Sequence, residues 1–100
     1  MHAVIHHAIN DPAKWDQSTQ RIMSMIDQGR LPKGLKPLEY LPSVDGHKAV
    51  CVWEADSLNT LREFMDRETW GAAWNEYFEV KVDNAIGLPK SEVTPVAKAA

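Results

Sequence analysis

Blocks of apolar and polar residues along this chain predict a small set of strands and amphipathic helices. Residues 49–53, AVCVW, are five successive apolar residues rich in β-branched and aromatic types, which predicts a central strand covered on both faces. Residues 3–9 form a similar short apolar segment, closed by an Asn-Asp-Pro sequence. We expect this segment to be a second strand, at least partly buried on both sides.

Helical spacing of apolar residues follows each of these two segments. Asp11 can cap the free amides of a new helix, Pro12 suits its first turn, and Gly29 can end it after about four turns. Ser57 offers a second cap directly after the central strand. The apolar stripe that follows consists of Leu58, Leu61, Phe64 and Met65. Both helices are therefore expected to pack on the sheet.

Two further strands and a third, shorter helix complete the predicted elements. Residues 35–41 suggest a strand that lies at a sheet edge or begins after Pro37, because Pro37 cannot donate to a ladder. Asp45-Gly46 marks the hairpin turn into the central strand. Aromatic residues at helical spacing within residues 67–78 predict a short extra helix whose aromatic side packs inward. Residues 78–82 then alternate apolar with charged side chains, which predicts the last strand.

The order strand, helix, strand, strand, helix, strand is that of an α+β, ferredoxin-like βαββαβ fold with an antiparallel four-stranded sheet and both helices on one face. Residues 1–88 make one domain of this kind, and residues 89–100 form a tail without periodicity, flexible or in contact with a partner. The uncovered sheet face is too apolar for water. We therefore expect a homodimer in which two sheets close an α/β barrel around a cavity.

Composition and charge restrict the partners of the chain. The net charge is −3 and the basic residues are scattered, so neither nucleic acid nor a membrane is expected as a partner. No apolar run approaches the roughly 18 residues that span a bilayer, and we expect a cytoplasmic protein. Cys51 is the single cysteine, interpreted as an apolar core residue rather than a reactive thiol. No residue spacing indicates a metal site, and no cofactor is expected.

The strand order, the length, the stretch VCVWEADSLNTLREFM and the aromatic segment running into FEVKV together resemble the dimeric α/β-barrel superfamily. That superfamily includes antibiotic-biosynthesis-type monooxygenases and muconolactone-isomerase-like enzymes. Within it, the chain is most similar to uncharacterised bacterial groups related to those monooxygenases, over residues 1 to about 88. The resemblance implies the fold and the dimer, and it assigns no catalytic residue.

Adjacent histidines on the first strand are the first candidates for chemistry. Neighbouring strand residues face opposite ways, so one of His6 and His7 must face the barrel cavity. Ile5 and Ile9 share the face of His7, which we expect to meet the helices. His6 is then the candidate general base or haem ligand in the cavity, although a hydrogen-bonded core imidazole is the interpretation we favour. His7 is a candidate ligand-binding residue.

Aromatic residues supply the candidate pocket walls. Trp53, Trp70 and Trp74 would line a pocket for a flat aromatic ligand, and Tyr40 would orient a ligand oxygen, with core and interface packing as the plainer interpretation. Glu79 or Asp83, on the predicted last strand, would pair with His6 for proton abstraction beside a carbonyl, unless these are simply solvated carboxylates at a strand end.

Three functional hypotheses follow from these residues. The first is a homodimer that binds a small apolar or aromatic molecule in its barrel cavity. The second is a cofactor-independent monooxygenase or isomerase that acts on an aromatic, quinone-like or enolisable substrate with His6 as its base. The third is a haem-binding or haem-degrading protein that uses His6 or His7 as a ligand. The sequence does not decide whether the protein is an enzyme.

Overall fold

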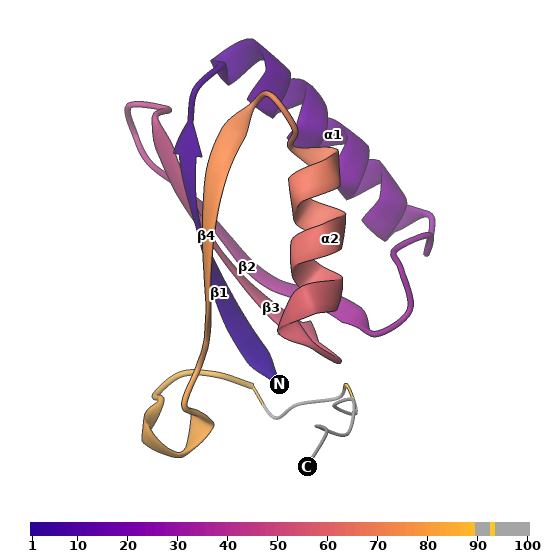
Figure 1. Cartoon of the computed structure of the whole chain (residues 1–100), viewed down its shortest axis with the longest axis vertical. Coiled ribbons are helices and arrows are strands. Elements are labelled where there is room, and N and C mark those ends of the chain that lie inside the picture. The colour runs from indigo at the N-terminus through magenta and orange to yellow at the C-terminus, as the bar shows by residue number, and fades with distance from the viewer. Residues whose placement is uncertain (90–92, 94–100) are drawn as a thin grey trace.

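A twisted antiparallel sheet with two helices on one face forms the body of the molecule (Figure 1). The computed structural model describes residues 1–89 and 93. The elements are β1 His2–Ile9, α1 Pro12–Asp27, β2 Leu35–Pro42, β3 Lys48–Ala55, α2 Leu58–Glu68, β4 Ala73–Glu79 and the 3₁₀ helix η1 Val82–Asn84. The four strands lie in the order β2-β3-β1-β4, so the predicted ferredoxin-like α+β fold is confirmed. The predicted tail, apart from Pro89 and Val93, lies outside the described residues.

Strand positions follow the hydrophobic pattern. β1 and β3 occupy the centre of the sheet, and β2 lies at an edge, as Pro37 predicts. A register shift between Pro37 and Glu39 marks an irregularity in the β2–β3 pairing. Gly46 adopts a φ of 78° in the turn that joins these strands, a conformation that few residues other than glycine adopt.

Both main helices begin at the residues whose side chains can cap them. The Asp11 carboxylate accepts a hydrogen bond from the Lys14 amide at 3.1 Å, and Ser57 Oγ accepts one from the Thr60 amide at 3.1 Å. Gly29 follows α1 with a φ of 65°. The predicted starts of both helices and the end of the first are therefore confirmed.

The prediction of an extra helix within residues 67–78 is wrong. α2 ends at Glu68, Gly71 turns the chain with a φ of 76°, and β4 pairs with β1. Trp70 and Trp74, expected to pack inward, are 86% and 70% exposed. Residues four apart share one face of a helix, but they also share one face of a strand, so this aromatic spacing does not distinguish the two. Hydrogen bonding to β1 determines the outcome.

The last strand also lies earlier than predicted. The alternation over residues 78–82 was expected to form it, yet β4 ends at Glu79 and Val82 begins the 3₁₀ helix η1. The extent of β1, the strand that pairs with β4, explains why β4 ends there. Ala3 of β1 pairs with Glu79, and the last hydrogen bond beyond it joins the Val80 amide to the His2 carbonyl, where β1 begins. Among the described residues, no strand extends past that point to pair with β4.

The main core lies between the sheet and the helices. It is centred on buried side chains from β1, β3 and α2: Ile5, Trp53, Leu61, Phe64 and Met65. A smaller cluster of Ile9, Trp15, Ala49 and Ala72 lies under the start of α1. No helix among the described residues is both long and apolar enough to cross a membrane.

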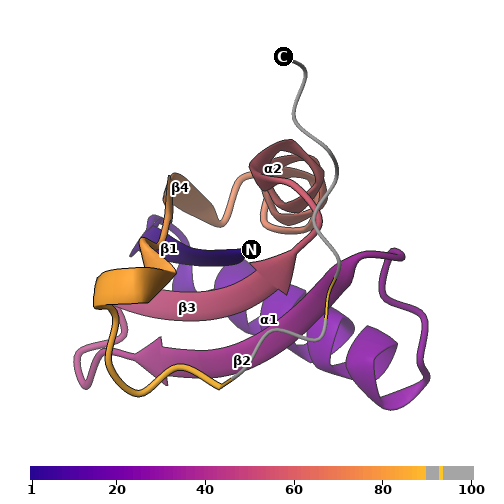
Figure 2. The same ribbon diagram turned by 90° about the horizontal axis from the view of Figure 1, so that it is seen from below.

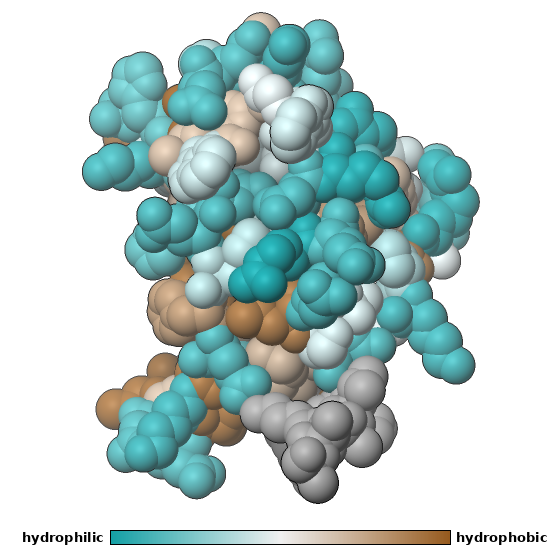
Figure 3. All heavy atoms as spheres, in the orientation of Figure 1, coloured by the Kyte–Doolittle hydropathy of each residue, from teal (hydrophilic) through white to brown (hydrophobic). Residues whose placement is uncertain are grey.

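The opposite face of the sheet is exposed at one end, and we call it the open face. At its other end His2, Val52 and Glu54 are buried, and the Val93 amide donates to Glu54 Oε2 at 3.1 Å. Strand register places on it apolar or aromatic side chains from all four strands, together with His6: Val4, Leu41, Val50, Trp74 and Phe78. The chain after β4 leaves the sheet on the side away from the helices (Figure 2). Apolar atoms gather around the lower end of β4 and this following segment (Figure 3), where Phe78, Val82 and Ile86 are exposed.

Candidate functional site

A cavity of about 300 Å³ lies between α1 and the helix-covered face of the sheet. All of its walls come from one chain, and most of them are apolar. The lining residues are His7, Trp15, Thr19, Ile22, Met23, Ile26, Pro37, Leu38, Glu39, Tyr40, Cys51, Trp53 and Met65. This cavity lies on the opposite side of the sheet from the open face, on which the barrel was expected to close.

His7 is the ionisable group deepest in the wall of this cavity, at 2% exposure. Its Nδ1 lies 2.6 Å from Asn75 Oδ1, and its Nε2 lies 3.2 Å from Cys51 Sγ. Burial lowers the pKa of His7, against the opposing effects of the Asn75 hydrogen bond and the Asp66 charge. Burial also raises the pKa of the Cys51 thiol to about 12. Both groups are therefore neutral at pH 7, and Cys51 is an inert core residue, as predicted.

Asn75 connects His7 to a polar cluster at the surface. Its Nδ2 donates to Asp66 Oδ1 at 3.1 Å and to Thr69 Oγ1 at 2.8 Å. The Tyr77 hydroxyl donates to the same Asp66 oxygen at 2.5 Å. These residues come from α2, β4 and the segment between them. Asn75 of β4 therefore links the buried His7 to the solvent-exposed carboxylate of Asp66.

Trp15 and Tyr40 join α1 to β2 at the side of the cavity. The Trp15 indole donates to the Tyr40 hydroxyl at 3.0 Å, and the Trp15 ring centroid lies 4.7 Å from that of His7. Burial raises the pKa of Tyr40, so the hydroxyl is protonated and can donate its own hydrogen to a ligand. The cavity thus combines aromatic walls with two polar groups, His7 and Tyr40, that can fix the orientation of a ligand.

Of the residues singled out from the sequence, His7, Tyr40 and Trp53 line this cavity. His6 lies on the open face with an exposed ring, 6.2 Å from the ring of Phe78, so the inferred orientations of the two histidines are confirmed. Glu79 is exposed and pairs with Ala3, whose side chain is on the other face from His6, so the structure does not bring His6 and Glu79 together.

Trp70 and Trp74 line a separate depression of about 160 Å³ together with Asp66, Ala73 and Asn75. They are not part of the cavity beside His7.

Three residues that shape the site were not singled out from the sequence as site residues: Trp15, Asn75 and Cys51. Of Cys51, only the burial was expected. The apolar stripe of α1 already contained Trp15, and its place on the same helix face as Ile22 was the available signal. Asn75 could not be found, because the segment around it was predicted to be a helix. Within the described residues, no group of three or more His, Cys, Asp or Glu side chains is arranged to hold a metal ion.

Comparison with known proteins identifies a relative in fold. No protein-family model matches the chain, and no curated protein matches it. Among solved structures, it is similar to the crystal structure of a monooxygenase from the gene ActVA-Orf6 of Streptomyces coelicolor in complex with the ligand Nanaomycin D. The TM-score is 0.50 at 16% sequence identity, over 89% of this chain and 91% of that chain. This likeness shows that the two chains share a fold.

Proposed function

We propose that this protein binds a small, largely apolar molecule, preferably a flat aromatic one, in the cavity between α1 and the sheet. The observation that carries the proposal is the cavity itself, about 300 Å³ in volume, with apolar walls and few polar groups. Ligand sites in proteins commonly begin at about this size and have this composition. Trp15 and Trp53 provide the rings against which a planar ligand would pack.

A substitution that fills the cavity tests this proposal. Thr19 is a half-buried residue of α1 that lines the cavity, and Gln20 is its exposed neighbour on the same helix. Thr19→Phe should place a ring in the cavity and weaken the binding of naphthalene-sized probes by at least about tenfold, a loss of roughly 1.4 kcal/mol. Gln20→Phe adds the same side chain outside the cavity and should leave binding unchanged. Quenching of tryptophan fluorescence measures both.

The outcome that contradicts the proposal is equal probe affinity in both variants and in the wild type. Wild-type protein that shows no quenching with any planar probe would contradict it as well. Thermal unfolding should be measured in parallel, because Thr19→Phe is expected to keep the fold and only fill empty space.

A second candidate function is a cofactor-independent monooxygenase or isomerase, with His7 in place of His6 as the base. The observation that favours it is a neutral imidazole in the wall of an apolar cavity, as proton abstraction requires. The relative in fold described above is itself a monooxygenase. Oxygen uptake with a panel of hydroquinones should then be lost in His7→Phe and retained in His6→Phe. Equal rates in the two variants would refute the role of His7.

We also propose a homodimer formed through the open face. Trp74, Phe78 and Leu41 expose large apolar side chains on this face, and a second copy would cover them and complete the barrel. Sedimentation at micromolar concentration should give twice the mass of one chain. Trp74→Glu should shift the mass towards one chain while the helix-covered cavity still binds its probes.

A further inference from the structure

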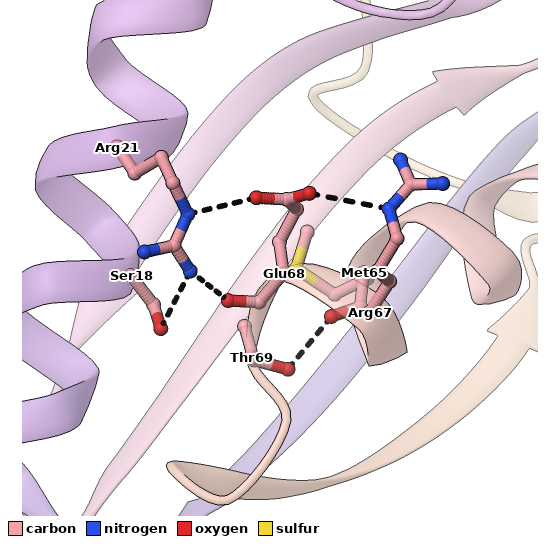
Figure 4. Close-up of polar contacts among 6 residues, drawn as sticks. All are labelled: Ser18, Arg21, Met65, Arg67, Glu68 and Thr69. Carbon is pink, nitrogen blue, oxygen red and sulfur yellow. Dashed lines mark hydrogen bonds and ion pairs between the residues drawn. The ribbon is translucent and has the colours of Figure 1, made fainter.

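The orientation of the Asn75 amide can be deduced from the groups around it. Thr69 Oγ1 donates its one hydrogen to the Met65 carbonyl at 2.7 Å (Figure 4), so towards Asn75 it can only accept. Asp66 Oδ1 is a carboxylate oxygen that already accepts from Tyr77, so it too can only accept. Both neighbours require an N–H donor from Asn75. The amide NH₂ therefore points to Thr69 and Asp66, and Oδ1 points to His7.

This orientation fixes the hydrogen on the His7 ring. An amide oxygen cannot donate, so His7 Nδ1 must carry the hydrogen in the 2.6 Å contact with Asn75 Oδ1. A neutral imidazole has only one N–H, and Nε2 is then left with its lone pair. The contact opposite agrees with this assignment, because the protonated Cys51 thiol can donate its S–H to Nε2 at 3.2 Å.

We infer that Asn75, held by Thr69 and Asp66, is a positioning residue that fixes His7 as the Nδ1–H tautomer and so makes the cavity selective for ligands with a hydrogen-bond donor. The selectivity rests on the proposed function, since it requires a ligand in the cavity. A thiol is a weak donor, and a ligand hydroxyl can take its place on Nε2 with a stronger hydrogen bond. A ligand that offers only an acceptor would face the imidazole lone pair and would be disfavoured.

The tautomer can be tested without any ligand. The ¹⁵N shifts of the histidine rings distinguish a protonated from an unprotonated nitrogen, and the exposed His6 on the same strand serves as an internal reference. Wild-type His7 should show protonated Nδ1 and unprotonated Nε2 at pH 7. Asn75→Leu removes the acceptor and should populate Nε2–H. A wild-type ring with its hydrogen on Nε2 would overturn the inference.

A matched pair of probes tests the selectivity. 2-Naphthol and 2-methoxynaphthalene share one ring system, but only the naphthol can donate a hydrogen bond. Wild-type protein should bind the naphthol about tenfold more tightly, and Asn75→Leu should reduce this ratio to about threefold or less. A ring spectrum of His6 and a thermal unfolding transition of Asn75→Leu that match those of the wild type separate positioning of His7 from a general loss of structure.

Two other results of the probe experiment distinguish a failure of the selectivity from a failure of the proposed function. Equal binding of the two probes by the wild type would overturn the selectivity and leave the proposed function intact. Binding of neither probe would overturn the proposed function together with the selectivity, while the positioning role of Asn75 is decided by the ring spectrum alone.

Discussion

Arg21 is the side chain that ties α1, the outer wall of the cavity, to the end of α2 (Figure 4). Its Nε donates to Glu68 Oε1 at 2.9 Å and its Nη2 donates to the Glu68 carbonyl at 2.6 Å. Arg67 approaches the other Glu68 oxygen at 3.3 Å through a single nitrogen. We therefore predict that Arg21→Met destabilises the fold more than Arg67→Met does.

The magnitude follows from the number of contacts and their exposure. Charge-assisted hydrogen bonds contribute about 1.5–3 kcal/mol each when well shielded. The Arg21 side chain is 49% exposed and Glu68 only 10%, so water screens the pair in part. We expect a loss of about 1–2 kcal/mol for Arg21→Met, which lowers the melting temperature of a domain of this size by roughly 5–10 °C. Arg67 is 67% exposed, and its removal should cost about 0.5 kcal/mol or less.

Urea unfolding followed by circular dichroism at 222 nm measures these changes, and a double-mutant cycle isolates the pairwise energies. The cycle joins each arginine variant to Glu68→Gln. Coupling of about 1 kcal/mol for Arg21 with Glu68, and much less for Arg67 with Glu68, is expected. The cycle also removes the separate contribution of Arg67 above the Phe64 ring, at 5.9 Å from the centroid. Equal coupling energies for the two arginines would refute the reasoning.

Three further predictions concern His7, Cys51 and Gly34. Burial lowers the pKa of His7, so neutral His7 contributes its full stability above about pH 6.5 and loses it as pH falls. The free energy of unfolding should therefore drop more steeply below about pH 6.5 in the wild type than in His7→Phe, and parallel curves would contradict this. Cys51 should react with a disulfide reagent at neutral pH only after unfolding in urea, and fast labelling of the native protein would disprove its burial. In Gly34→Ala the new Cβ would lie 2.5 Å from Asp56 Oδ2, whereas in Gly46→Ala it would have nothing within 4 Å, and both glycines have positive φ. Urea unfolding should therefore show that Gly34→Ala is more destabilising than Gly46→Ala by at least about 1 kcal/mol. Equal losses of stability would show that Asp56 moves aside without cost.

Much of the fold could be predicted because local signals and long-range pairing agree. Asp11, Pro12 and Ser57 mark helix starts through hydrogen bonds to their own neighbours, so the sequence contains all the information that these elements need. The apolar run of β3 is central in the sheet because both of its faces are covered or apolar. The conformation of such elements is determined by residues that are close together in the sequence.

β4 could not be predicted because its conformation depends on a partner far along the chain. Trp70 and Trp74 are spaced as on a helix, and only pairing with β1 shows that Ala73 begins a strand. The site shares this limitation. His7 could be assigned to the helix-covered face from its neighbours, but Asn75, which orients it, is 68 residues away and enters the site only through the register of β4. The alternation of side chains along β1 predicted on which face of the sheet His7 lies, but the pairing of β4 with β1 determines which residue hydrogen-bonds to His7.

The cavity and the open face lie on opposite sides of the sheet, so the proposed ligand site and the proposed dimer contact use different residues of the same strands. Odd-numbered positions of β1, such as Ile5 and His7, belong to the interior compartment, and even-numbered ones, such as Val4 and His6, belong to the opposite surface. The affinity for the proposed ligand should thus be independent of the protein concentration. In evolutionary terms, substitutions at even positions can alter self-association while the interior chemistry stays intact, so descendants of this chain could change assembly and specificity separately.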